Sequence, residues 1–167
     1  MSSTALLILV AGLGLIGWLV ARAKAQRLNT GRGALHSLPG HHGWYLALWI
    51  ALPAVAAVAL WSSISPGLVL NAVLSDPVAA SLPAMDMERN AILSEAFTLA
   101  ENPGAAAFNP DAEKLIPAVT AAQTKFGLIG AALAALLAFA GGGYGYTRLT
   151  ASFPARTKVE RVVMIVL

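Results

Sequence analysis

The chain contains three long stretches without a charged side chain, at residues 5–21, 43–62 and 126–147. A helix of about 20 apolar residues is long enough to cross the hydrocarbon core of a bilayer, which is roughly 30 Å thick. Charged residues make up only 11% of the 167 residues, and hydrophobic residues make up 57%. A soluble domain of this size still exposes about a third of its unfolded surface, so it could not hide this much apolar side chain. The sequence therefore predicts an all-α integral membrane protein with three transmembrane helices.

Basic residues are concentrated in two segments, residues 22–42 and 148–161, in which Glu160 is the only acid. Residues 63–124, between the second and third spans, carry more acids than bases. Because cytoplasmic loops are enriched in Lys and Arg, we expect an outside N-terminus, cytoplasmic basic segments and a periplasmic loop at 63–124. The bases that set this topology, and that we expect at lipid headgroups, are Arg22, Lys24, Arg27, Arg32, Arg148, Arg156, Lys158 and Arg161.

The predicted periplasmic loop is too long for a plain connection, so we expect it to be partly helical. Asp86 is a candidate cap for a helix over residues 87–100. Asn109 and Pro110 predict a second helix start, and this helix would run through Pro117 into the third span. The helix over residues 87–100 would turn Ile92, Ala96 and Leu99 towards a core and Glu88 and Glu95 towards water. The remaining prolines, which we expect to interrupt helices, are Pro66, Pro77, Pro83 and Pro103.

The end of the chain predicts the beginning of a further helix. Residues 162–167 are apolar, but six residues make only about 9 Å of helix and cannot cross a bilayer. We therefore divide the chain into an N-terminal membrane extension, residues 1–147, and a cytoplasmic elbow with the start of a fourth span, residues 148–167.

Small residues recur at four-residue spacing in the third span, as at Gly130, Ala134 and Ala138. Such spacing lets membrane helices approach closely. Gly12, Gly14 and Gly17 spell G-x-G-x-x-G, but a dinucleotide site needs a strand before this motif and a helix after it. Because these glycines lie inside a predicted span, we interpret them as helix-packing residues.

No residue pattern predicts catalysis, a metal ion or a cofactor. His36, His41 and His42 could bind zinc, but their segment holds no carboxylate, so we expect interfacial histidines. A membrane enzyme with a histidine metal centre stays open as a minor alternative. The acids Glu95, Glu101, Asp111 and Glu113 could form a cation site, but the nearby bases Arg89 and Lys114 favour a solvated outer face. Nothing in the charge pattern predicts nucleic-acid binding.

Two segments resemble a known family. The segment LHSLPGHHGWYLALWIALPA, residues 35–54, resembles the opening of the N-terminal extension of bacterial phosphate ABC transporter permeases of the PstC type. Residues 156–167 are similar to the basic lead-in to the first core helix of these permeases. His41 departs from the pattern, because an aromatic residue is expected there. The positions that fit the first segment are Ser37, Leu38, Pro39, His42, Gly43, Tyr45, Trp49 and Pro53.

The resemblance implies a non-catalytic part in the uptake of inorganic phosphate across the bacterial inner membrane. It implies three partners: a second permease subunit, a cytoplasmic ATPase and a periplasmic phosphate-binding protein. The E-A-A loop that grips the ATPase is missing, since the nearest fragment, residues 95–97, has Glu101 where the pattern needs Gly. We therefore expect a truncated permease whose extension anchors or assembles the complex, with the phosphate pathway elsewhere. The alternative is a stand-alone membrane scaffold that binds a partner through its outer loop.

Overall fold

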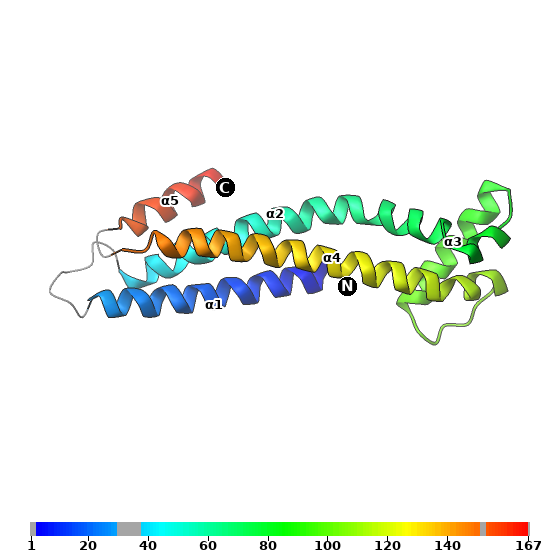
Figure 1. The fold of residues 1–167 in the computed structure, drawn as a ribbon, viewed down its shortest axis with the longest axis horizontal. Helices are drawn as coiled ribbons and strands as arrows, with labels where there is room; N and C mark the ends of the chain where they lie inside the picture. Colours follow the sequence, from blue (N-terminus) through cyan, green and yellow to red (C-terminus); the bar gives the residue numbers. More distant parts are fainter. Residues whose placement is uncertain (1–2, 30–37, 151–152, 167) are drawn as a thin grey trace. The chain divides into compact units, whose positions relative to one another are not determined.

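A computed structural model describes residues 3–29, 38–150 and 153–166 of the chain, and these residues form helices and connecting turns with no strand (Figure 1). The helices are α1 (Ser3–Asn29), α2 (Pro39–Leu74), the 3₁₀ helix η1 (Pro77–Ser81), α3 (Asp86–Glu101), α4 (Pro110–Thr147) and α5 (Ala155–Val166). Of these, α1, α2 and α4 are long and apolar enough to cross a membrane. The prediction of an all-α protein with three candidate spans is confirmed.

Helices α2 and α4 are longer than one membrane crossing requires. They contain 36 and 38 residues, which correspond to about 54 and 57 Å of helix. The expected helix start at Pro110 and the continuation through Pro117 are confirmed. The prediction that Pro66 interrupts the helix is wrong, because α2 continues to Leu74. Burial of Val69 and Val73 on this last part of α2 favours the helix despite the hydrogen bond that Pro66 cannot donate.

The chain forms two compact units. One, which we call the three-helix unit, comprises Ser2–Leu60 and Gly130–Leu167, and the other, the connecting unit, comprises Trp61–Ile129. In the three-helix unit, α1 runs alongside the first part of α2 and the last part of α4 (Figure 1). Its buried core consists of Leu6, Val10, Ala21, Tyr45, Leu46, Ile50, Ala54, Val58, Ala134, Ala138 and Leu149. Many other large apolar side chains on these helices are exposed in the isolated chain. Such exposure is expected of helices whose outer surfaces contact lipid.

Small residues allow α4 to lie close to α2. Gly130, Ala134 and Ala138 are all buried, so the predicted packing stripe is confirmed. The stripe continues at Gly145, where an added Cβ would lie 2.9 Å from Leu46 Cδ1. A Cβ at Gly141 would overlap the carbonyl oxygen of Trp49, which leaves room only for glycine. The close contact thus depends on residues that lack bulk rather than on interlocking large side chains.

Glycine also brings α1 and α2 together, but at only one of the three predicted positions. A Cβ at Gly17 would overlap the side chain of Ile50. By contrast, a Cβ at Gly12 or Gly14 would meet nothing within 4 Å. The packing interpretation of the G-x-G-x-x-G motif is therefore confirmed for Gly17 alone.

The connecting unit buries one face of α3 against the last part of α2 and the first part of α4. Trp61 at the start of the unit donates a hydrogen bond from Nε1 to the Phe126 carbonyl oxygen at 3.1 Å, which joins α2 to α4. The predicted core positions Ile92, Ala96 and Leu99 are confirmed, and Leu93 joins them. The complete buried core is Val69, Val73, Ile92, Leu93, Ala96, Leu99, Ala112, Leu115, Val119 and Ala122.

Two predictions about polar residues in the connecting unit are wrong. Asp86 is the first helical residue rather than the cap, and Met85 occupies the cap position without a side-chain hydrogen bond. Glu95 does not simply face water, because its Oε1 accepts hydrogen bonds from the backbone N–H groups of Phe108 and Asn109, at 2.6 and 3.1 Å. The carboxylate satisfies backbone donors just before α4 and places negative charge at the positive end of that helix dipole.

Candidate functional site

The structure brings aromatic and basic side chains together around a cavity of about 240 Å³ in the three-helix unit. The cavity is formed by the beginning of α2, the end of α4, Phe153 and α5. Because these elements come from two separate parts of the sequence, residues 45–49 and residues 144–162, the cavity exists only once the helices have packed. Its lining residues are Tyr45, Trp49, Tyr144, Arg148, Phe153, Lys158, Arg161 and Val162.

A chain of aromatic contacts builds the wall of this cavity. The ring centroids of Tyr45 and Phe153 are 4.7 Å apart in an edge-on arrangement. The Trp49 ring lies 4.6 Å from that of Tyr144, and Tyr45 lies 6.3 Å from Trp49. Such spacings are typical of favourable aromatic pairs. The contacts join α2 both to α4 and to Phe153, two residues before α5.

The basic residues of the cavity are not neutralised by the acid on α5. Lys158, Arg161 and Val162 share one face of α5 by their spacing and line the cavity. Glu160 instead accepts a hydrogen bond from Arg156 Nε at 2.8 Å, and neither residue lines the cavity. This hydrogen bond, together with the attraction between the two charges, raises the pKa of Arg156. The cavity therefore gathers positive charge without an acidic lining residue.

The third base of the cavity, Arg148, is held over an aromatic ring. Its guanidinium carbon lies 5.1 Å from the centroid of Tyr144, a distance at which the ring attracts the cation. Arg148 follows α4 directly, where a positive charge also interacts favourably with the helix dipole. Both interactions place this cation beside the aromatic wall.

The family-pattern residues lie at and near this end of α2. Tyr45 and Trp49 line the cavity itself. His42 is fully buried, with Nδ1 3.3 Å from the Leu38 carbonyl oxygen and its ring 6.3 Å from that of Phe153. Its Nε2 is buried without a hydrogen-bond partner among the described residues. His42 therefore acts as a packing residue here rather than as an interfacial side chain open to headgroups, which corrects the prediction for this histidine.

Of the other pattern positions, Gly43 and Pro53 lie close to a neighbouring helix. A Cβ at Gly43 would lie 2.7 Å from Trp18 Cδ1, so the absence of a side chain lets the indole ring pack there. Pro39 is the first residue of α2, and the Cγ of Pro53 would lie 3.1 Å from a Cβ at Gly141. Leu38 is 72% exposed. Ser37 lies outside the described residues, as do His36 and Arg32.

The remaining topology bases contact aromatic rings or lie exposed on α1. Lys24 Nζ donates a hydrogen bond to the Tyr146 carbonyl oxygen at 3.0 Å and lies 3.8 Å from the centroid of the Tyr146 ring. Arg22 lies over Trp18, with 5.1 Å between its guanidinium carbon and the ring centroid. Arg27 is exposed. Cations and aromatic rings thus meet on α1 as well as around the cavity, an arrangement suited to a membrane interface.

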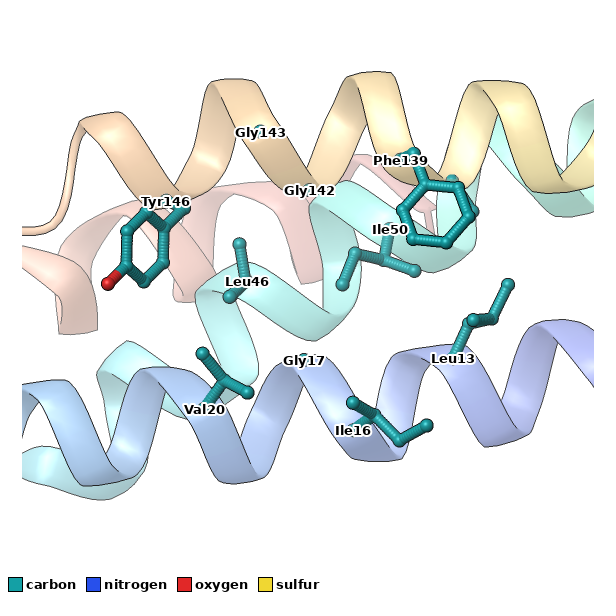
Figure 2. A pocket seen from close by; sticks show the side chains of 11 residues that line it. Leu13, Ile16, Gly17, Val20, Leu46, Ile50, Phe139, Gly142, Gly143 and Tyr146 are labelled. Atoms are coloured by element: carbon teal, nitrogen blue, oxygen red, sulfur yellow. The ribbon is translucent and has the colours of Figure 1, made fainter.

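A second cavity in the same unit is apolar. It measures about 340 Å³ and lies between α1, α2 and α4 (Figure 2). Its lining consists almost entirely of aliphatic and aromatic carbon, so it offers contact area but no group for chemistry. The residues are Leu13, Ile16, Gly17, Val20, Leu46, Ile50, Ala138, Phe139, Gly142, Gly143 and Tyr146.

The acids of the connecting unit are not arranged as a cation site. Glu95 accepts the two backbone hydrogen bonds described above, and Asp111 forms an ion pair with Lys114 at 2.7 Å. Glu101 and Glu113 are exposed. Among residues 3–29, 38–150 and 153–166, no group of three or more His, Cys, Asp or Glu side chains could hold a metal ion.

The sequence did not predict the cavity as a site, although five of the residues that line it carry other predictions. Tyr45 and Trp49 stood out as pattern residues, and Arg148, Lys158 and Arg161 as topology bases. No pattern in the sequence marks Tyr144 as a site residue. The only signal in the sequence was the proximity of aromatic and basic residues between positions 144 and 161.

Comparison with known protein families matches residues 6–167 to a family described as phosphate ATP-binding cassette transporter. No curated protein and no solved structure matches the chain. The family match covers nearly the whole sequence, including most of α1 and all of the other helices. The chain belongs to this phosphate ATP-binding cassette transporter family.

Proposed function

We propose that the chain is the N-terminal membrane part of a PstC-type permease subunit and that it anchors or assembles an importer of inorganic phosphate. The observation that carries the proposal is the family match over residues 6–167 together with three helices long enough to cross a membrane. The pattern residues support it as well, because Gly43, Tyr45 and Trp49 pack at the helix contacts of the three-helix unit.

The proposed location is the bacterial inner membrane. The three-helix unit would lie in the bilayer, with its basic residues at the cytoplasmic face and the N-terminus outside. The connecting unit would lie in the periplasm, which agrees with its excess of acidic residues. Residues 148–167 would form a cytoplasmic elbow that leads into the first core helix of the permease.

The proposed role is structural rather than catalytic. The predicted spans, at residues 5–21, 43–62 and 126–147, carry no charged side chain that could coordinate a permeating anion. We therefore assign the phosphate pathway to other helices of the transporter. The partners would be a second permease subunit, a cytoplasmic ATPase and a periplasmic phosphate-binding protein.

Co-purification tests the proposal. The tagged chain is isolated in mild detergent from membranes of its own host grown in low phosphate, and the associated proteins are identified by mass spectrometry. We expect permease and ATPase subunits in amounts close to that of the chain. A stably inserted chain that is recovered alone, or with proteins unrelated to phosphate transport, would contradict the proposal and favour an independent membrane scaffold.

A further inference from the structure

The cavity between α2, α4 and α5 combines features that suit an anion at a membrane interface. Arg148, Lys158 and Arg161 line it, and these side chains have no ion-pair partner within the described part of the chain. Glu160, the acid on α5, is engaged with Arg156 outside the cavity. An anion that entered the cavity would therefore meet three cations and would not have to displace a carboxylate.

The chemistry of the lining favours a phosphate group in particular. The guanidinium groups of Arg148 and Arg161 can each direct two N–H donors at the oxygens of one phosphate, and Lys158 adds a compact positive charge. Tyr45 and Tyr144 carry hydroxyl groups that can donate further hydrogen bonds. Trp49 and Phe153 supply apolar surface beside these polar groups. Such a lining fits a group that is anionic at one end and is bound next to hydrocarbon.

We infer that this cavity binds a phosphate-bearing anion, either the headgroup of an anionic lipid or free inorganic phosphate. The site goes beyond the proposed structural role and does not depend on it, because a scaffold unrelated to transport would carry the same cavity. Binding would also tie α5 to α2 and α4, since the lining residues come from all three helices.

The test uses the purified 167-residue chain in a neutral detergent. Binding of phosphatidylglycerol, phosphatidylcholine and inorganic phosphate is measured in separate titrations by native mass spectrometry and isothermal calorimetry. We expect an anionic probe to bind and the Lys158→Gln/Arg161→Gln variant to bind it about 25-fold more weakly, since each interfacial charge contributes about fivefold. A matched variant, Arg89→Gln/Lys125→Gln, removes the same charge from the connecting unit, outside the cavity, and should change the affinity less than about twofold.

Two further comparisons make the result decisive. The variant Lys158→Arg/Arg161→Lys keeps both charges and should retain most of the affinity, which separates loss of charge from loss of structure. Variant-sensitive binding of phosphatidylglycerol that inorganic phosphate does not displace identifies a lipid headgroup as the ligand. Variant-sensitive binding of inorganic phosphate identifies the free anion. Equal affinities of the two Gln variants for both anionic probes, or no binding of either probe, would overturn the inference.

Discussion

The backbone of Gly141 in α4 lies directly against the carbonyl oxygen of Trp49 in α2, so that a Cβ at position 141 would overlap that oxygen. The neighbour is backbone and cannot rotate away as a side chain could. The contact fixes the approach of the two helices at the end of the unit where the basic cavity lies.

We expect Gly141→Ala to destabilise the three-helix unit by about 3 kcal/mol, because one helix must shift to admit the methyl group. The matched control is Gly143→Ala, where a Cβ meets nothing within 4 Å. The control should be neutral or up to about 1 kcal/mol more stable, since alanine favours a helix over glycine. Thermal unfolding in detergent, followed by circular dichroism, measures both. Equal midpoints for the two variants would show that α2 and α4 do not approach in this way.

A smaller effect is expected at Gly43. An alanine Cβ there would lie 2.7 Å from Cδ1 and 2.8 Å from Nε1 of Trp18, and the indole ring would have to move. Because the neighbour is a side chain, we expect a loss of about 1 kcal/mol, less than at Gly141. Gly40→Ala is the control, since a Cβ there has open space. The same melting experiment ranks the variants, and a larger loss at Gly40 than at Gly43 would refute the placement of Trp18.

Glu95 provides a test of the connecting unit. Replacing it with alanine removes the acceptor for the N–H groups of Phe108 and Asn109, which we expect to cost about 1 kcal/mol. Amide hydrogen exchange at residues 108 and 109 should become faster. Glu88→Ala removes an exposed carboxylate from the same helix and should leave this exchange unchanged. Unchanged exchange in the Glu95 variant would mean that its carboxylate does not cap the start of α4.

Part of this architecture was predictable from the sequence because it depends on local patterns. Uncharged stretches identify the spans, and four-residue spacing identifies the buried stripe at Gly130, Ala134 and Ala138. The cavity was not predictable, because Trp49 and Tyr144 meet only through the packing of helices far apart in the chain. The capping role of Glu95 has the same origin: helical periodicity turned this residue towards water, whereas the tertiary fold placed two backbone donors beside it.

The proposed topology predicts the accessibility of single cysteines. The chain has no natural cysteine, so no residue needs to be removed first. A cysteine that replaces the exposed Glu101 of the connecting unit should react with a membrane-impermeant maleimide in spheroplasts. A cysteine in place of Arg27 should react only after the membrane is permeabilised. The reverse pattern would mean that the three spans have the opposite orientation.

Phosphate uptake tests most directly whether the chain serves a phosphate importer. Uptake of radiolabelled phosphate is measured in host cells that carry an in-frame deletion of the chain and are starved of phosphate. We expect uptake to fall and to be restored by the wild-type chain and by Gly143→Ala, but less by Gly141→Ala at equal membrane abundance. Wild-type rates of uptake in the deletion strain would contradict the assignment of this chain to phosphate import.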